Sequence, residues 1–563
     1  MARAGARGRR RPARRHRGLA PGGRDASRFR AGPGPARTPG SRPLTAAPTA
    51  RPRLRLSPVA RASLLIATLF AIDKPLDLLR QVVVGRQFGV GAELDAFHAA
   101  NNLPDLMRAL ITGGALALAL IPVLADVRER HGRPALWLLF SRVANLAFTV
   151  TAVLTVAVAL AAETLVAAPW GIAPGFPAER QQLVADLMRL NLVALLLFSV
   201  SGLLTSGLQA NQHFFLPALA PVVYDLGQIF GALVLAPTSG LVVAGLRLPA
   251  FGLGVHGLVD GVIVGAALHL LVQLPGLARF GFRWSPAFGW RDPRLRQVLT
   301  LMLPRLLTIG AFQAMFLVQD NLASRLPAGA VTALTYGWLI MQFPETLIAT
   351  ALGTALLPTL SELFARRDAA AFADSVARAL RLLLALALPA AVLLAVTVEP
   401  LVSSLFAFGE AGSALVAAAT RGFLIGLVGH AWLEVLARAW FARLQASPPL
   451  AGRAVGFITF LGLGAALVAP LGVFGLALAN SIAFTGEALI LLLLLRRHYP
   501  GIVRLGRTGG RVLAGSVAAV AAAVLTSWLV PGGGLLDAAA AAAAGALVCL
   551  PFLIPELRLL ASL

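Results

Sequence analysis

Residues 103–126, LPDLMRALITGGALALALIPVLAD, carry the pattern that decides the fold class. The stretch opens with a proline, continues as an apolar helix long enough to cross a bilayer, and ends in Pro-x-Leu-x-acid. Residues 343–362, FPETLIATALGTALLPTLSE, repeat that order in the second half of the chain. An even number of predicted spans separates the copies, so the halves would be parallel repeats related by an axis along the membrane normal. The alternative is chance similarity between two helices rich in Ala and Leu.

The composition of the whole chain is that of a membrane protein. Hydrophobic residues make up 58% of the 563 residues and charged residues 13%, with a mean hydropathy of +0.78, whereas soluble domains carry about a quarter charged residues. We therefore expect an all-α integral membrane protein, with two parallel six-helix lobes around a central cavity and two further C-terminal helices. Apolar windows of spanning length predict about fourteen transmembrane helices, at residues 62–86, 94–123, 137–161, 183–208, 215–236, 250–274, 298–324, 332–357, 378–398, 417–442, 452–471, 474–495, 512–530 and 536–556.

The net charge of +24 is concentrated near the start of the chain, where sixteen arginines lie within residues 1–56. This segment has no apolar run that could offset the entropy lost on folding, so we expect it to be disordered. It would be a basic arm beside anionic lipid, or else a passive tail or the product of a wrongly assigned start codon. Nucleic acid is not expected as a partner.

Arginine also collects in predicted loops on one side of the membrane, at residues 128–133, 279–296, 366–367 and 496–511. Because positively charged short loops stay in the cytoplasm, both termini are expected there. The predicted organisation is a basic arm (1–56), a first lobe (57–275), a cytoplasmic linker (276–297), a second lobe (298–497) and a C-terminal helix pair (498–563).

Ionisable residues inside the predicted spans are the first candidates for function, because burying one at mid-bilayer costs about 2.5–3.5 kcal/mol on insertion scales. The two arginines of the first two spans can each grip phosphate oxygens bidentately, which suits an anionic head group. The alternative is an internally paired polar stripe that only packs against other helices. The candidates are Asp73, Lys74, Asp77 and Arg80 in the first span, and Asp95, Asn102, Asp105 and Arg108 on either side of Pro104 in the second.

Other chemistries find little support in the sequence. The single cysteine, Cys549, allows neither a disulfide framework nor a thiolate metal site, and the pair His256 and Asp260 offers too few local ligands for a metal ion. The sequence has no Gly-rich phosphate loop with a following Lys, and no predicted outward loop long enough for a carboxylate catalytic centre. We therefore expect transport rather than catalysis, with no cofactor and no metal.

A resemblance to a known family is carried by residues 77–132, DLLRQVVVGRQFGVGAELDAFHAANNLPDLMRALITGGALALALIPVLADVRERHG. This stretch resembles the MurJ/MviN family of lipid II flippases, in which an Arg, an FGxG turn, a D-A-F, an L-P-x-L-x-R and a P-x-L-A-acid end follow in this order. Residues 303–313, LPRLLTIGAFQ, and 351–364, ALGTALLPTLSELF, are also similar to the family. The likeness covers about residues 60–555.

The resemblance implies a two-lobed member of the MOP exporter superfamily, with a cationic cavity and alternating access. The substrate would be lipid II, a peptidoglycan precursor on undecaprenyl diphosphate, flipped to the outer leaflet of the bacterial cytoplasmic membrane. Its lipid tail would follow a groove of the last two spans. The family's cavity residues fall on Arg80, Asp95 and Arg108, and Lys74 stands where the family usually has Arg. Residues that could support them are Asp77, Asn102, Asp105, Arg305 and Glu345.

Two departures from the family pattern bear on the substrate. Leu339 and Gln342 stand where the family commonly has an Arg and an acid, so the second lobe lacks its usual charge pair, for which Arg305 or Glu345 could compensate. The span at 452–471 has no acid, so no sodium site is predicted. The alternative functions are flipping of another polyprenyl-diphosphate glycan of the O-antigen type, drug efflux, and a scaffold role for a degenerate paralogue. We expect a monomer that contacts membrane lipid and cell-wall synthesis proteins.

Overall fold

The structure of the protein is a computed structural model that describes residues 58–111, 114–240, 242–243, 246–289, 292–503, 506–529 and 534–558. The expected disorder of the basic arm lies outside these ranges. The described chain is almost entirely helical, which confirms the predicted all-α fold class.

The first half of the described chain contains α1 (Pro58–Phe88), α2 (Ala92–Ile111), α3 (Gly114–Ala167), α4 (Ala178–Ala210), α5 (Phe215–Phe230), the π-helical turn η1 (Gly231–Leu235), the two-residue strands β1 (Val242–Val243) and β2 (Leu246–Arg247), α6 (Val255–Leu271) and α7 (Leu274–Arg279). The second half contains α8 (Pro293–Ala323), α9 (Ala330–Glu345), the π-helical turn η2 (Thr346–Thr350), α10 (Ala351–Ala365), α11 (Ala369–Phe406), α12 (Gly409–Leu424), α13 (Leu427–Ala442), α14 (Ser447–His498), α15 (Thr508–Leu529) and α16 (Leu535–Leu557).

Helix length and hydropathy in the structure give a different number of membrane spans from the number predicted from the sequence. Nine helices of the described residues are long and apolar enough to cross a membrane, or ten if α12 and α13, which meet at a bend of 46°, form one span. The sequence predicts more because it divides α14 at Gly472 and divides α3 near Gly132, with the first part of α3 joined to α2 in the span at 94–123. It also includes α1, α2 and α8, which fall outside the apolar set. Fourteen spans stay a prediction.

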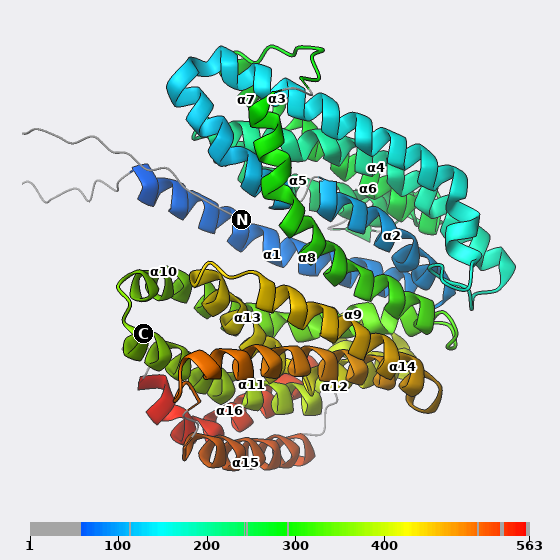
Figure 1. Cartoon of the computed structure of the whole chain (residues 1–563). Helices are drawn as coiled ribbons and strands as arrows, with labels where there is room; N and C mark the ends of the chain where they lie inside the picture. The colour runs from blue at the N-terminus through cyan, green and yellow to red at the C-terminus, as the bar shows by residue number, and fades with distance from the viewer. Residues whose placement is uncertain are drawn as a thin grey trace, which may run out of the picture. The chain divides into compact units, whose positions relative to one another are not determined.

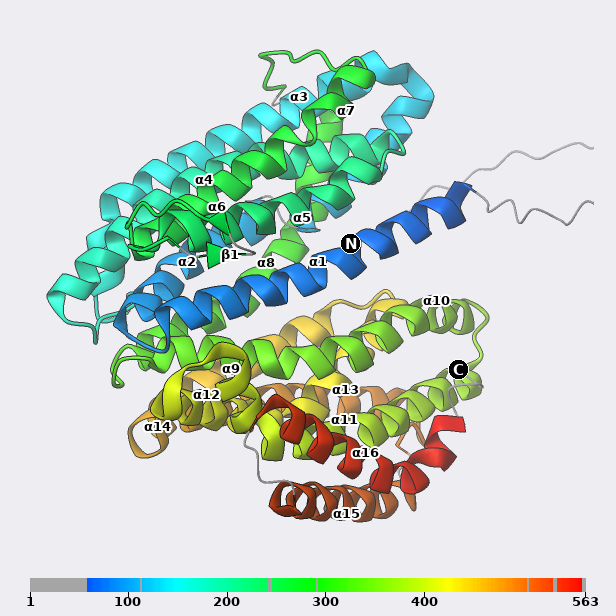
Figure 2. The same ribbon diagram turned by 180° about the vertical axis from the view of Figure 1, so that it is seen from behind.

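Two helix bundles repeat the same packing pattern. In the first, α1 packs on α5, α2 on α4, and α4 on both α3 and α6; in the second, α8 packs on α14, α9 on α12, and α12 on both α11 and α14. We call α1–α6 the first lobe and α9–α14 the second lobe, and Figures 1 and 2 show them as separate groups of ribbons. The pair α15 and α16 packs on α11, around the buried residues Leu393 and Cys549.

A hydrogen-bond motif recurs at corresponding places in the two lobes. In each, an arginine of one helix (α4 or α12) donates to a backbone carbonyl of the preceding helix (α3 or α11) and to a glutamate one helical turn further along that preceding helix. This recurrence is independent of the sequence similarity between residues 103–126 and 343–362, and it supports the parallel repeat. The partners are Ala159 O (3.2 Å) and Glu163 Oε1 (2.9 Å) for Arg189, and Ala395 O (3.0 Å) and Glu399 Oε2 (3.0 Å) for Arg421.

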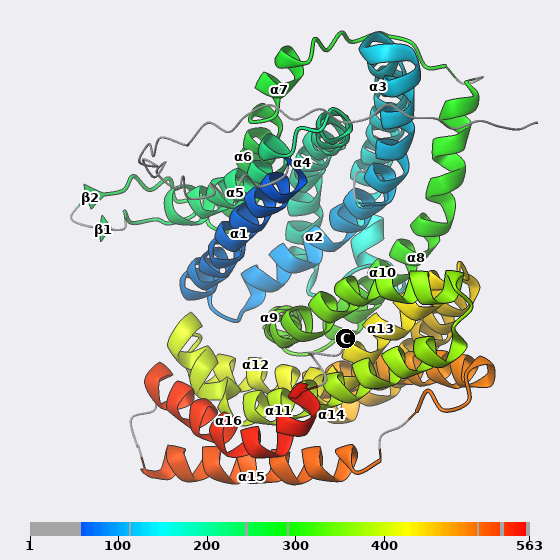
Figure 3. The ribbon, with the colours of Figure 1, turned by 90° about the vertical axis from the view of Figure 1, so that its left-hand side faces the viewer.

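Helix α8 is shared between the lobes. Its first turns are buried against α3, where Val298 belongs to the same apolar cluster as Phe140, and the helix also packs on α14. The start of α8 is tied to the first lobe, because Arg142 Nη1 of α3 donates to Asp292 Oδ2 at 2.5 Å. Asp292 also caps α8 by accepting a bond from the backbone N–H of Arg294, which satisfies one of the free N–H groups at a helix start. Figure 3 shows α8 running from the side of α3 towards the second lobe.

The lobes are bonded to each other near the turn between α1 and α2. Arg86 Nε donates to Leu405 O at 2.7 Å, and Tyr336 Oη donates to Gln81 O at 3.0 Å. Gly329, which precedes α9, has a φ of 95°, and a Cβ at this position would lie 2.6 Å from a methyl group of Val90. Both the backbone conformation and the close approach favour glycine there. We call this end of the molecule the closed end.

Candidate functional site

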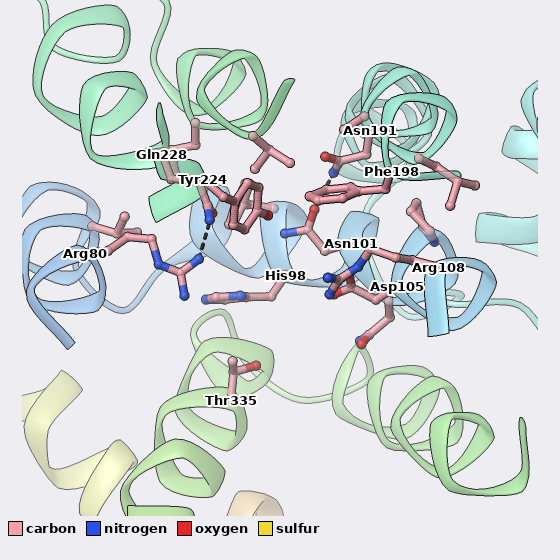
Figure 4. A pocket seen from close by; sticks show the side chains of 18 of the residues that line it. Arg80, His98, Asn101, Asp105, Arg108, Asn191, Phe198, Tyr224, Gln228 and Thr335 are labelled. Atoms are coloured by element: carbon pink, nitrogen blue, oxygen red, sulfur yellow. Dashed lines mark hydrogen bonds and ion pairs between the residues drawn. The ribbon is translucent and has the colours of Figure 1, made fainter. Parts of the chain in front are cut away.

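A cavity of about 340 Å³ lies between the first lobe and α9 (Figure 4). Its walls come from α1, α2, α4, α5 and α6, and of the residues that the structure describes in the second lobe, Thr335 of α9 alone lines it. Three of the lining side chains are charged, namely Arg80, Asp105 and Arg108. Among the described residues, the cavity therefore draws its polar groups almost entirely from the first lobe.

Helix α2 supplies the polar floor of the cavity. His98, Asn101, Asp105 and Arg108 follow one another at spacings of three, four and three residues, which places them on one helical face. Pro104 lines the cavity on the same helix. A proline inside a helix removes one backbone hydrogen bond, and membrane helices tolerate such a break where neighbouring protein or a wet cavity satisfies the freed carbonyl.

Arg80 lies at one end of the cavity and is held from three sides. Its Nη1 donates to Gln228 Oε1 of α5 at 2.7 Å, its Nη2 donates to Asp77 Oδ1 on the preceding turn of α1, and its Nε lies 3.6 Å from Asp225 Oδ1. The Asp225 side chain is 8% exposed. Two carboxylates thus face one guanidinium, so the positive charge at this end is more than compensated.

Arg108 marks the other end of the cavity. Its Nη2 donates to Asp105 Oδ1 at 3.0 Å, and its guanidinium lies over the ring of Phe198 of α4, 5.3 Å from the ring centroid. The Arg108 and Asp105 side chains are 44% and 46% exposed, whereas that of Arg80 is 19% exposed. Arg108 is therefore the more accessible of the two arginines.

The structure places two predicted cavity residues elsewhere. Asp95 is 1% exposed and does not line the cavity. Its carboxylate accepts bonds from Gly329 N (2.6 Å), Thr332 N (2.8 Å) and Thr332 Oγ1 (2.7 Å) at the start of α9. The first N–H groups of a helix have no partner within it, so a carboxylate there is strongly held. Lys74 is also outside the lining, with 66% of its side chain exposed and Asp73 Oδ2 3.8 Å from its Nζ.

Some of the predicted supporting residues lie at the cavity and others do not. Asp77 and Asp105 hold the two cavity arginines, and Asn102, which lines the cavity, donates to Asp320 of α8. Glu345 at the end of α9 does not line the cavity, and Thr346 Oγ1 donates to it at 3.4 Å. The side chain of Arg305 lies outside the described part of the structure, so its suggested role stays a prediction.

Several lining residues were not expected from the sequence. Gln228, Tyr224 and Phe198 lie on α4 and α5, which carry few charges, and nothing in the local sequence distinguishes them from helix-packing residues. His98 could have been found, because it lies three residues before Asn101 on the face that also carries Arg108. The cavity is thus an assembly of one charged helix pair with neutral polar and aromatic groups from two others.

Helix α14 of the second lobe carries a buried ion pair. Arg453 Nη1 lies 3.3 Å from Glu487 Oε2, with the two side chains 13% and 3% exposed. The guanidinium also lies over the ring of Phe484, 4.8 Å from its centroid. Both charged residues belong to α14 and neither lines the cavity. They form a separate charged centre within the second lobe.

A comparison with protein families decides the identity of the chain. The family model described as "Lipid II flippase MurJ" matches residues 84–532, which include most of both lobes. The chain belongs to the MurJ family of lipid II flippases. The lipid II flippase MurJ of Burkholderia cenocepacia is 30% identical over 448 residues, covering 78% of this chain and 84% of that protein. The probable lipid II flippase MurJ of Vibrio cholerae is 28% identical over 440 residues, covering 76% and 82%. These findings confirm the resemblance carried by residues 77–132.

Solved structures of MurJ and of related transporters share the fold. A lipid II flippase MurJ in an inward closed conformation gives a TM-score of 0.73 at 20% identity, covering 88% of this chain and 100% of that chain. A multidrug resistance transporter of the MATE family and MOP superfamily, in an inward-facing conformation, gives 0.61 at 16% identity, covering 78% and 98%. The chain therefore shares its helical fold with both of these transporters.

Proposed function

We propose that the protein flips lipid II, or a closely similar peptidoglycan precursor on undecaprenyl diphosphate, from the inner to the outer leaflet of the bacterial cytoplasmic membrane. Membership of the MurJ family supports the substrate class, since the Burkholderia cenocepacia relative is named a lipid II flippase and the Vibrio cholerae relative a probable lipid II flippase. The observation that carries the proposal is the cavity with Arg80 and Arg108 at its ends, since a guanidinium is the side chain best suited to phosphate oxygens. The protein would act by transport, without bond chemistry of its own.

The direction of access follows from where the lobes touch. Helices α8 and α11 reach the closed end with their last turns, so the arginine-rich residues 279–289 and 366–367, which precede these helices, lie at the opposite end. Such connections stay in the cytoplasm. The closed end would then face outward, with both termini in the cytoplasm. Arg108 is sixteen residues along α2 from its start at the closed end, about 24 Å at 1.5 Å per residue, and is more exposed than Arg80. The cavity would therefore be open to the cytoplasmic side.

Alternating access would begin from this arrangement. The diphosphate head group would enter from the cytoplasm and lie between Arg108 and Arg80. The bonds at the closed end would then break as the lobes rotate, with α8 acting as their shared element. We place the polyprenyl tail on the surface formed by α15 and α16, which expose large apolar side chains such as Leu525, Trp528 and Leu547. The protein would work as a monomer.

Complementation in cells depleted of their own lipid II flippase tests the proposal. The wild-type protein should restore growth, and Arg80→Ala or Arg108→Ala should abolish rescue at unchanged membrane expression. Arg130→Ala is the matched control, because Arg130 pairs with Asp126 outside the cavity and its side chain is 72% exposed. Full rescue by both cavity variants would refute the role of the cavity. No rescue by the wild type, with transport of another polyprenyl-diphosphate glycan instead, would refute lipid II as the substrate.

A further inference from the structure

Besides Arg80 Nε, two nitrogen atoms at the Arg80 end of the cavity have no hydrogen-bond partner among the described residues. They are Gln228 Nε2 and His98 Nε2, both buried and both on side chains that line the cavity. Gln228 as a whole is 7% exposed. A buried polar nitrogen without a partner is costly unless a water molecule or a ligand satisfies it. The two atoms therefore indicate where a ligand with acceptor groups would bind.

The orientation of the Gln228 amide follows from its neighbour. Arg80 Nη1 donates to the amide oxygen at 2.7 Å, and a guanidinium has donors only, so the amide must turn its oxygen towards Arg80. The NH₂ group is then left to face elsewhere. Because Gln228 lies on α5 and Arg80 on α1, this bond also fixes the distance between the two walls of the cavity.

The ring of His98 is held by aromatic packing. It meets Phe97 edge to face at 5.5 Å between ring centroids and Tyr336 of the second lobe at 6.1 Å. Figure 4 shows the ring extending from α2 towards Arg80. Asn101 and Asn191, which also line the cavity, are bonded to each other. Gln228 and His98 are thus the neutral groups beside Arg80 that retain an unused nitrogen.

The charges around Arg80 explain why neutral donors matter. The two carboxylates of Asp77 and Asp225 outweigh its single guanidinium, so an incoming anion meets no net positive charge from these three groups. A neutral N–H group can donate to a phosphate oxygen, and it carries no charge that a neighbouring carboxylate would cancel. Hydrogen bonds to a charged acceptor are also stronger than those between neutral groups. Phosphate oxygens accept on every side, which matches a set of donors from three helices.

We propose that Gln228 and His98, together with Arg80, bind the phosphate oxygens of the polyprenyl diphosphate substrate. Gln228 donates from its amide Nε2, and His98 donates from Nε2 in the tautomer that carries hydrogen there. The inference rests on the proposed function, because the diphosphate is the ligand that function supplies. It adds two phosphate-binding residues, one on α5 and one on α2, to the arginines found in the sequence.

Binding of undecaprenyl diphosphate to the purified full-length protein in lipid nanodiscs tests the inference, with undecaprenol as the uncharged ligand. Gln228→Glu keeps an acceptor for Arg80 and replaces the donor by a carboxylate oxygen, and His98→Phe keeps the aromatic packing and removes the nitrogen. We expect Kd for the diphosphate to rise at least about tenfold in Gln228→Glu and about three- to tenfold in His98→Phe. Kd for undecaprenol should not change in either variant.

Gln445→Glu and His256→Phe make the same chemical changes outside the cavity lining and should bind both ligands as the wild type does. Wild-type affinity for the diphosphate in both cavity variants would overturn the inference, as would equal weakening for undecaprenol or no diphosphate binding by the wild type. The proposed function is tested separately: a protein that binds the diphosphate through these residues but fails to rescue flippase depletion would refute lipid II flipping and leave the phosphate site standing.

Discussion

Removing the Asp95 carboxylate should weaken the contact between the two lobes at the closed end of the protein. Asp95 lies on α2 of the first lobe, and its three bonds reach the first turn of α9 in the second lobe. The side chain is 1% exposed, so little water competes for these bonds. In Asp95→Ala, the N–H groups of Gly329 and Thr332 and the Thr332 hydroxyl lose their acceptor while the lobes are together. Separation of the lobes would expose these groups to water.

The magnitude follows from the number of bonds lost. A hydrogen bond to a charged group contributes about 1.5–3 kcal/mol, and replacing a capping Asp by Ala costs about 0.5–2 kcal/mol. Because the three bonds share one carboxylate, their contributions are not additive. We expect Asp95→Ala to raise the free energy of the closed arrangement by about 3 kcal/mol relative to the open one. This corresponds to roughly a hundredfold shift in the ratio of the two populations. Thr332→Val removes one of the three bonds and should shift the ratio about fivefold.

Labelling of a cysteine at the closed end measures this shift. Val90→Cys places a thiol against Gly329 and Gly412 of the second lobe, and a Cys549→Ala background removes the native thiol. A membrane-impermeant maleimide added from outside should label Val90→Cys about a hundredfold faster in Asp95→Ala than with Asp95 present, and at an intermediate rate in Thr332→Val. An unchanged labelling rate in Asp95→Ala would refute the assignment of Asp95 to the contact between the lobes.

Three further changes have distinct expected outcomes. Arg80→Lys should fail to rescue flippase depletion although it keeps the charge, because the donors of an ammonium all lie on one nitrogen and do not reproduce the planar fork whose two nitrogens reach Gln228 and Asp77; growth curves at matched expression would show this. Asp225→Asn should tighten binding of undecaprenyl diphosphate severalfold by removing one negative charge beside Arg80, and weaker binding in the same assay would contradict the charge balance. Arg453→Met should destabilise the protein by about 3–5 kcal/mol, since it leaves Glu487 buried and unpaired, whereas changing both residues to Met should restore most of the lost thermal stability.

The local part of the site was predictable from the sequence. Arg80 pairs with Asp77 and Arg108 pairs with Asp105, in each case at a spacing of three residues on one helix. Such pairs depend only on helical geometry, so a correct helix assignment places them. The helices themselves follow from apolar length, because an uninterrupted apolar stretch in a membrane satisfies its backbone polar groups only as a helix or a closed barrel.

The number of spans was less predictable than the fold. The sequence counts α1, α2 and α8 as spans, whereas their polar residues leave these helices outside the set that is apolar enough to cross a membrane. The sequence around Asp95 does not indicate its partner either. An acidic residue near a helix start has the same local sequence pattern whether it faces a cavity or another helix. Its bond to Gly329 joins residues 234 positions apart.

The sequence by itself determined the helical fold, the family and the two arginines of the cavity, since each of these depends on hydropathy, short motifs or local spacing. Only the tertiary structure decided that Asp95 closes the lobes instead of lining the cavity, that Lys74 stays outside it, and that Gln228 and His98 stand beside Arg80. The reason is that a side chain's role in a helical bundle is set by which helix it meets. That choice depends on the packing of segments such as α1 and α5, whose bonded residues Arg80 and Gln228 lie 148 positions apart.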